Sequence, residues 1–182
     1  MRVIAGTAKG RTILGPKRDD IRPTSDRVRE TIFNVLGQWV EGRVLDLFAG
    51  TGALAIEALS RGASRAVLVD SGREAQQLIE KNLETLGFTD RAELVRMPFE
   101  RALDDLERRA QPFDLVFADP PYAAHVGQKL LAFFAQSKLL APGATLVLES
   151  DKREPEPSAP GIEQIDERKF GDTRVRMYRR VP

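Results

Sequence analysis

The chain has 182 residues and a formal net charge of +1, with 42% hydrophobic and 30% charged residues, a balance typical of a soluble protein with one domain-sized core. The absence of cysteine excludes disulfides, thiolate metal sites and a thiolate nucleophile, and the single histidine cannot form a metal cluster alone, so we expect no bound metal. No run of about 18 apolar residues and no signal-peptide pattern occurs in the sequence, so we expect a cytoplasmic protein without a membrane partner.

The predicted elements begin with a hairpin and a helix. RVIAGTAKGRTILG (2–15) predicts two short strands around Gly6–Gly10, and TSDRVRETIFNVLGQWV (24–40) predicts a helix that begins at a Ser/Asp pair. Further strands are predicted at residues 43–48, 65–70, 92–97, 113–118 and 144–150. Helices between them are predicted at about 53–60, 73–87, 100–110 and 124–137. A proline-rich loop at 153–161 then precedes a final hairpin, 162–180, which turns at Gly171-Asp172.

This alternation predicts an α/β fold. Strands separated by helices form a mostly parallel sheet with helices on both faces, and the final hairpin adds an antiparallel strand at its edge. We expect two parts: residues 1–40 as a small hairpin-and-helix extension, and residues 41–182 as the main domain. Because ligands bind at the carboxyl ends of parallel strands, the segments that follow strands 43–48, 65–70 and 113–118 should meet.

The first of these segments is a glycine loop, in VLDLFAGTGALA (44–55). Gly50 and Gly52 allow a tight turn and a close approach of the backbone to a ligand. The pattern also fits the dinucleotide fingerprint, so by itself it leaves open NAD and other nucleoside cofactors, and also an ordinary turn. Asp46, which lies just before the end of the strand, favours a cationic or amine-bearing ligand over a pyrophosphate.

The second segment ends at Asp70, at a spacing from the glycine loop that suits two hydrogen bonds to a ribose diol. Such a carboxylate would serve any adenosine cofactor. The alternative is a structural role, as the cap of the helix that follows.

The third segment is DPPY, which ends the apolar strand FDLVFA (113–118). An ionised Asp119 accepts hydrogen bonds but donates none, and Pro120 and Pro121 have no N–H, so this turn presents acceptors in a fixed geometry. Tyr122 supplies a flat ring on which a base can stack. The site therefore suits an amino group on a planar ring, and the alternative is a rigid turn with a surface tyrosine.

Basic residues gather at both ends of the chain. Residues 1–29 hold eight Lys/Arg against three Asp, and residues 168–182 hold six against one. This distribution favours a polyanionic partner, although ordinary solvated surface charge would look the same.

Together these motifs resemble the class I S-adenosylmethionine-dependent methyltransferases that modify exocyclic amino nitrogens. Three further segments, RVIAGTAKGR (2–11), RPTSDRVRETIFN (22–34) and FGDTRVRMY (170–178), resemble the bacterial members that methylate guanine N2 in 16S ribosomal RNA. The resemblance extends from residue 2 to about residue 178, and RPTSDRVRETIFN is its most specific part.

The resemblance implies a Rossmann-like fold with a seven-stranded sheet, S-adenosyl-L-methionine as cofactor, and 16S ribosomal RNA as partner, either free or within an assembling small ribosomal subunit. The catalytic residues it implies are Asp119, Pro120, Pro121 and Tyr122. The cofactor-binding residues it implies are Asp46, Phe48, Gly50, Thr51, Gly52 and Asp70. Where such enzymes usually carry Asp or Asn, this chain has RMPFE (96–100), so we expect Met97 and Phe99 to pack on the adenine ring. On this resemblance we expect residues 41–182 to be the catalytic domain and residues 1–40 to be an RNA-binding extension. The RNA-binding residues we expect are Lys9, Arg11, Arg22, Arg27 and Arg29.

Three other functions remain open at this point. An adenine-N6 methyltransferase acting on DNA or RNA would share DPPY and the glycine loop. An NAD-dependent oxidoreductase would explain the glycine loop but leave DPPY without a role. A non-enzymatic RNA-binding assembly factor would explain the basic ends but not the cofactor loop.

Overall fold

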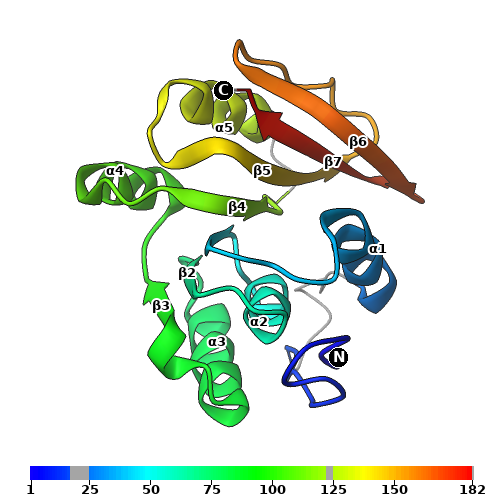
Figure 1. Cartoon of the computed structure of the whole chain (residues 1–182), viewed down its shortest axis with the longest axis vertical. Helices are drawn as coiled ribbons and strands as arrows, with labels where there is room; N and C mark the ends of the chain where they lie inside the picture. Colours follow the sequence, from blue (N-terminus) through cyan, green and yellow to red (C-terminus); the bar gives the residue numbers. More distant parts are fainter. Residues whose placement is uncertain (17–24, 122–124, 182) are drawn as a thin grey trace.

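Seven strands form one mixed sheet in the computed structural model, which describes residues 1–16, 25–121 and 125–181. Their order across the sheet is β3-β2-β1-β4-β5-β7-β6 (Figure 1). The strands are β1 (Arg43–Leu47), β2 (Arg65–Val69), β3 (Ala92–Val95), β4 (Phe113–Ala118), β5 (Leu140–Asp151), β6 (Ile162–Phe170) and β7 (Thr173–Arg180). The first five run parallel to one another, whereas β7 is antiparallel to both β5 and β6. The predicted α/β fold is confirmed.

The final hairpin differs from the prediction in one detail. Its antiparallel strand, β7, lies inside the sheet between β5 and β6, and β6 forms the edge. The burial of the two strands explains this order, because most of β7 is buried whereas most of β6 is exposed or half-buried. Although β7 carries four arginines, it places Val175 and Met177 in one buried cluster and Tyr178 in the other, whereas β6 buries only Ile162, so the interior position suits β7 better.

The described residues form five helices, of which the first precedes β1 and the other four connect consecutive strands from β1 to β5. The five helices are α1 (Asp26–Leu36), α2 (Ala53–Ser60), α3 (Arg73–Leu86), α4 (Phe99–Arg109) and α5 (Val126–Gln136), with a short 3-10 turn, η1, at Thr89–Arg91. The Ser25 hydroxyl caps α1 by accepting the Val28 N–H at 3.3 Å, and α3 ends at Gly87 in the left-handed conformation, as predicted for both. No helix in the described part of the chain is long and apolar enough to cross a membrane.

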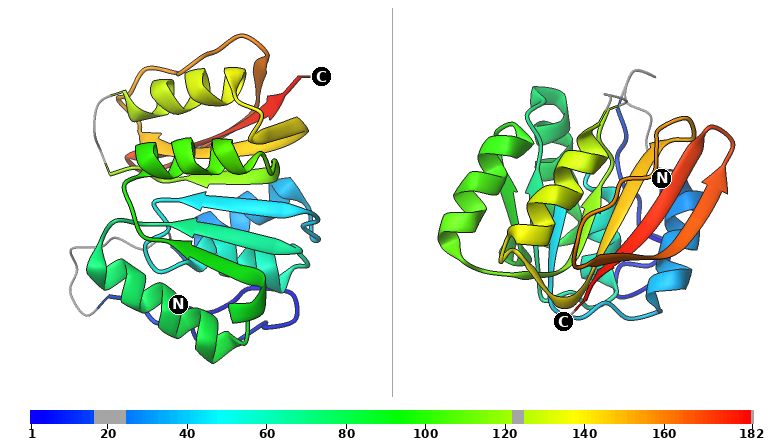
Figure 2. Two further views of the ribbon diagram at one scale, coloured as in Figure 1. Left: turned by 90° about the vertical axis from the view of Figure 1, so that its left-hand side faces the viewer. Right: turned by 90° about the horizontal axis from the view of Figure 1, so that it is seen from above.

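The helices cover both faces of the sheet. Apolar residues of α1, α2 and α3 form one buried cluster with the sheet, and those of α4 and α5 form a second cluster on the opposite face (Figure 2). Side chains alternate along the central strands: Phe117 of β4 joins the first cluster and the neighbouring Ala118 joins the second.

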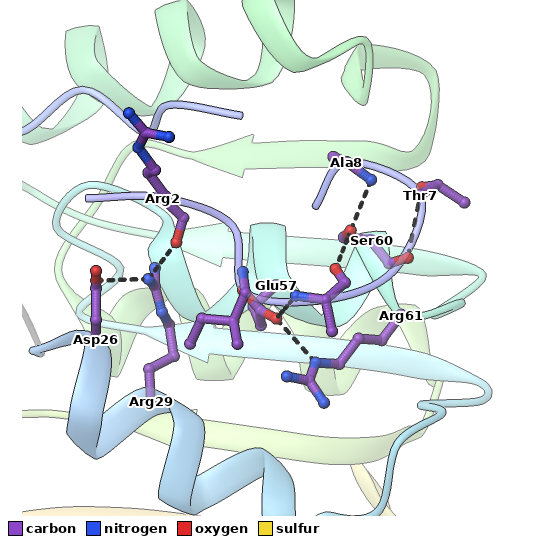
Figure 3. Close-up of polar contacts among 10 residues, drawn as sticks. Arg2, Thr7, Ala8, Asp26, Arg29, Glu57, Ser60 and Arg61 are labelled. Atoms are coloured by element: carbon purple, nitrogen blue, oxygen red, sulfur yellow. Dashed lines mark hydrogen bonds and ion pairs between the residues drawn. The ribbon is translucent and has the colours of Figure 1, made fainter. Parts of the chain in front are cut away.

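The start of the chain folds back on itself but does not form two regular strands. A single bridge joins Arg2 to Thr12, and its loop docks onto α2 (Figure 3). The Glu57 carboxylate accepts the backbone N–H groups of Ile4 and Ala5 at 2.9 and 3.0 Å. Since these N–H groups bond to a side chain of α2 rather than to a facing strand, the hairpin stays irregular.

Candidate active site

A cavity of about 920 Å³ opens at the carboxyl ends of β1, β2 and β4. Its wall also includes the start of α1, the end of β5 and the turn between β6 and β7. This is the edge of the sheet at which α/β proteins bind ligands, and the volume lies within the range of small-molecule and cofactor sites. The three segments that the sequence predicted to meet all line this cavity.

The glycine loop after β1 has the backbone that its residues predicted. Gly50 and Gly52 have φ angles of 59° and 79°, which glycine adopts without strain. A Cβ on Gly52 would lie 3.1 Å from the Leu68 side chain, so the loop is also closely packed. Phe48, which lines the cavity, has a φ of 64°. A bulky residue held in this region marks a backbone that the surrounding structure constrains, as is frequent at ligand sites.

Asp70 lies at the end of β2 and fixes the glycine loop in place. Its carboxylate accepts the Gly50 N–H at 2.9 Å and the Gly72 N–H at 2.8 Å. The first bond joins the two cofactor segments across β1 and β2, which the sequence did not reveal. A carboxylate oxygen can accept more than one hydrogen bond, so these contacts leave room for a ribose hydroxyl at the same group.

Asp46 is buried at the floor of the cavity, 2% exposed, and accepts the Ala55 N–H at 3.2 Å. Burial raises the pKa of its carboxyl to about 8, and the nearby carboxylates of Asp119 and Asp70 act in the same direction. A cation bound here would offset this cost, whereas an anion would add to it.

Asp119, Pro120 and Pro121 follow β4 at the centre of the sheet and line the same cavity. They face the cofactor segments across a shared space, as the DPPY interpretation requires. Tyr122 lies outside the described residues.

Met97 and Phe99 are absent from the part of the cavity wall that the described residues form. Both pack against the buried cluster on the α4 and α5 side of the sheet. The Phe99 ring lies 4.8 Å from the Phe48 ring, centroid to centroid, and Phe48 does line the cavity. Phe99 therefore supports a residue of the cavity wall, and the prediction that it contacts an adenine stays a prediction.

The predicted RNA-binding residues fall into different environments. Arg27 is exposed and lines the cavity, and Lys9 is exposed on the N-terminal loop. The Arg11 guanidinium donates to the Leu86 carbonyl at 3.1 Å, at the end of α3. Arg22 lies outside the described residues.

Arg29 corrects the sequence prediction. Its side chain is 0% exposed and donates to the Arg2 carbonyl at 2.6 Å and to the Asp26 carboxylate at 2.8 Å (Figure 3). A guanidinium enclosed in this way supports the N-terminal segment and cannot reach an RNA phosphate. The helical period contained the signal, because Arg29 is four residues before Phe33, which is fully buried on the same face.

Four cavity residues had no role in the site predicted from the sequence: Glu149 of β5, Lys169 and Phe170 at the end of β6, and Thr173 of β7. Their place in the site follows from strand order, because β5 and β7 continue the sheet beyond β4. No group of three potential metal-ligating side chains occurs within residues 1–16, 25–121 and 125–181.

Comparisons with known proteins agree with this geometry. The chain matches the model of a family described as conserved hypothetical protein 95 over residues 1–179. It is 38% identical to "Putative rRNA methyltransferase YlbH" of Bacillus subtilis, over 99% of both chains. It is 35% identical to "Ribosomal RNA small subunit methyltransferase D" of Escherichia coli, over 99% of this chain and 90% of that one. A solved structure described as "Putative methyltransferase yhhF from Escherichia coli" superimposes with a TM-score of 0.86 at 36% identity, over 100% of this chain and 98% of that one.

Proposed function

The chain belongs to the conserved hypothetical protein 95 family and is related along its length to ribosomal RNA small subunit methyltransferase D, and from this membership we infer that it methylates small-subunit ribosomal RNA. We propose further that the methyl group goes to the exocyclic N2 of a guanine in 16S ribosomal RNA. One observation carries the proposal: the glycine loop, Asp70 and the Asp119-Pro120-Pro121 turn line a single cavity.

The charges of the cavity favour S-adenosyl-L-methionine as the cofactor. Asp46, Asp70 and Asp119 line it together, and the raised pKa of Asp46 reflects both burial and their mutual repulsion. The cofactor carries a positive sulfur and an ammonium group, which such a site stabilises. A dinucleotide would place a pyrophosphate among the same carboxylates, so the NAD-dependent alternative loses support.

The residues of the glycine loop and Asp70 would hold the adenosine part of the cofactor, with Asp70 accepting from the ribose hydroxyls. When bound, S-adenosyl-L-methionine would supply a methyl group that its positive sulfur makes electrophilic. Phe48, Thr51 and the backbone of the loop would enclose the rest of the molecule. The loop is held ready by Asp70, so little reorganisation accompanies binding.

Asp119 and the Pro120 carbonyl would orient the target amino group. In a free base the nitrogen lone pair is delocalised into the ring, and acceptance of both N–H groups directs it toward the methyl carbon. A nitrogen–carbon bond would then replace the carbon–sulfur bond, whose electron pair would remain on sulfur. Asp119 or water takes the proton that the amino group loses. The contribution of the protein is therefore mostly positioning.

Residues 1–40 would bind the RNA around the target, with Lys9 and Arg27 on their exposed surface. A base that is paired or stacked must leave the RNA helix to reach the cavity, which costs roughly a few kcal/mol. Phosphate contacts from these basic residues would offset part of that cost.

The test is methylation in vitro. Purified protein is incubated with methyl-labelled S-adenosyl-L-methionine and either unmethylated 16S ribosomal RNA or small ribosomal subunits, and the RNA is digested to nucleosides. We expect N2-methylguanosine at one position. N6-methyladenosine would establish the adenine-N6 alternative, and an absence of label in RNA despite cofactor binding would overturn the proposed function.

A further inference from the structure

The cavity continues beyond Asp119 into a part that the glycine loop, Asp70 and the Asp119-Pro120-Pro121 turn do not form. We call residues 46–75 of its wall the cofactor half. The base half consists of the wall residues on α1, β5, β6, β7 and the turn between β6 and β7: Ser25, Arg27, Val28, Glu149, Lys169, Phe170, Gly171 and Thr173. Strand order separates the halves, because β2 and β1 lie on one side of β4, and β5 and β7 lie on the other.

Glu149 is the acidic residue of the base half and lies next to Asp119. Ala118 of β4 pairs with Leu148 of β5 in a parallel ladder, so the residues that follow them, Asp119 and Glu149, start from neighbouring positions on strands about 4.8 Å apart. Phe117 and Val147 both belong to the cluster on the α1 side of the sheet. Alternation therefore directs Asp119 and Glu149 to that same side, where both line the cavity.

Two adjacent carboxylates match the edge of guanine. On guanine the N2 amino group is next to the N1–H, so two neighbouring positions both donate hydrogen bonds. On adenine the N6 amino group is next to N1, which is an acceptor and would face a carboxylate lone pair without a proton between them. An ionised carboxylate accepts but does not donate, so a second acid beside Asp119 favours the first base and disfavours the second.

We propose that Glu149 accepts the N1–H of the target base while Asp119 and the Pro120 carbonyl accept from its N2 amino group, so that Glu149 selects guanine over adenine. This assignment rests on the proposed function. The rest of the base half has the chemistry that an extruded nucleotide needs. Phe170 offers a ring at the cavity wall, and Lys169 and Arg27 bring positive charge for phosphate.

The test uses 2-aminopurine, which keeps the 2-amino group but has an acceptor at N1. Once the methylated guanine is located, two versions of 16S ribosomal RNA are assembled by ligation, one with guanine and one with 2-aminopurine at that position. The two RNAs then compete for the protein in one reaction. We expect the wild-type protein to methylate the guanine RNA about 10- to 100-fold faster than the 2-aminopurine RNA, because the loss of one hydrogen bond to a charged group has an effect of this size. Glu149→Gln, whose amide donates to an N1 acceptor, should lower that preference at least tenfold.

Matched controls separate this role from folding. Asp151→Asn makes the same acid-to-amide change two residues further along β5, where the carboxylate pairs with Arg153, and it should keep the wild-type preference. Glu149→Ala should lose rate on guanine without gaining rate on 2-aminopurine. Where a variant reacts too slowly, the affinities for the two RNAs with S-adenosylhomocysteine bound give the same ratio.

The outcomes for the two proposals are distinct. If the wild-type protein methylates no guanine in 16S ribosomal RNA, the proposed function fails. If it methylates guanine N2 but Glu149→Gln keeps the wild-type preference by rate or by affinity, the role of Glu149 is overturned and the proposed function stands.

Discussion

The cofactor half of the cavity comes from one continuous stretch, residues 46–75, whereas the base half comes from stretches as far apart as Ser25 and Thr173. The first half is tied together internally, by the Asp70 bond to the Gly50 N–H, and its backbone is held in left-handed conformations. The second half depends on how α1, β5 and the β6–β7 hairpin pack. Under the proposed function, a local motif would bind the cofactor, while the fold of the whole chain would decide which base is accepted. Substitutions in the two halves should therefore separate cofactor binding from RNA recognition.

Asp119 stands at the boundary, and its removal should have the largest effect on the reaction. In Asp119→Ala the target amino group loses an acceptor, so the single-turnover rate of methyl transfer should fall by about 10²–10⁴, the range of a positioned acid–base group. Asp119→Asn keeps an oxygen acceptor without the charge, so its single-turnover rate should lie between those of the wild type and Asp119→Ala. Isothermal titration calorimetry should show that Asp119→Ala binds the cofactor with an affinity close to that of the wild type. Asp104→Ala, at an exposed site on α4, is the control and should keep the wild-type rate. A near-normal rate of methyl transfer in Asp119→Ala would contradict the proposed role of Asp119 in the reaction.

Asp46 tests the cofactor half through pH. Because burial raises its folded-state pKa from 3.8 to about 8, the folded protein holds a proton that the unfolded chain releases, so the contribution of Asp46 to stability should decline as pH rises from about 4 to about 8. Asp46→Asn lacks this decline. In urea unfolding of the cofactor-free protein, the variant should gain stability relative to wild type with each pH unit across that range.

Asp90→Asn, at an exposed position, is the control for this measurement. Parallel stability curves for Asp46→Asn and wild type would mean that water or a counter-ion keeps Asp46 ionised in the folded state.

Asp70→Ala should weaken the cofactor half and leave the base half intact. The variant loses an acceptor for the ribose hydroxyls and for the Gly50 N–H, and hydrogen bonds to a charged group are worth about 1.5–3 kcal/mol. Calorimetry should show S-adenosyl-L-methionine binding weakened at least tenfold, with RNA affinity unchanged. A folded variant with wild-type cofactor affinity would reduce Asp70 to a structural residue.

Arg27→Ala should produce the smallest effect of the four variants, and this effect should be on RNA binding at the base half. Loss of one phosphate contact should reduce the slope of log affinity against log salt by somewhat less than one, for unrelated RNA as well as for 16S ribosomal RNA. Cofactor affinity should not change. Arg65→Ala is a matched control, since Arg65 is exposed at the start of β2, away from the carboxyl ends of the strands. Equal slopes for wild type and Arg27→Ala would make Arg27 ordinary surface charge.

The sequence predicted those parts whose causes are local. The apolar run 113–118 is β4 to the residue, and Gly87 ends α3, because strand burial and helix termination depend on neighbouring residues. The glycine loop, Asp70 and the Asp119-Pro120-Pro121 turn line one cavity as expected, because parallel strands bring their carboxyl ends together.

The parts that the sequence did not predict depend on distant partners. Arg29 carries a surface type of side chain, yet its neighbours Arg2 and Glu57 come from other segments and bury it. The two predicted N-terminal strands form only a single bridge because the Glu57 carboxylate accepts N–H groups that would otherwise pair with a facing strand. Glu149 carries no motif of its own, and it joined the site because β5 lies next to β4.

The docking of the N-terminal segment sets an order of events during synthesis. Ile4 binds Glu57, made 53 positions later, and Leu14 binds Asn82, made 68 positions later. These N-terminal residues therefore emerge from the ribosome before their partners, and their contacts with α2 and α3 form only after α3 has been synthesised. A chain shortened at its amino end could still form the sheet, but the fully buried Glu57 carboxylate would lose the two N–H groups of Ile4 and Ala5.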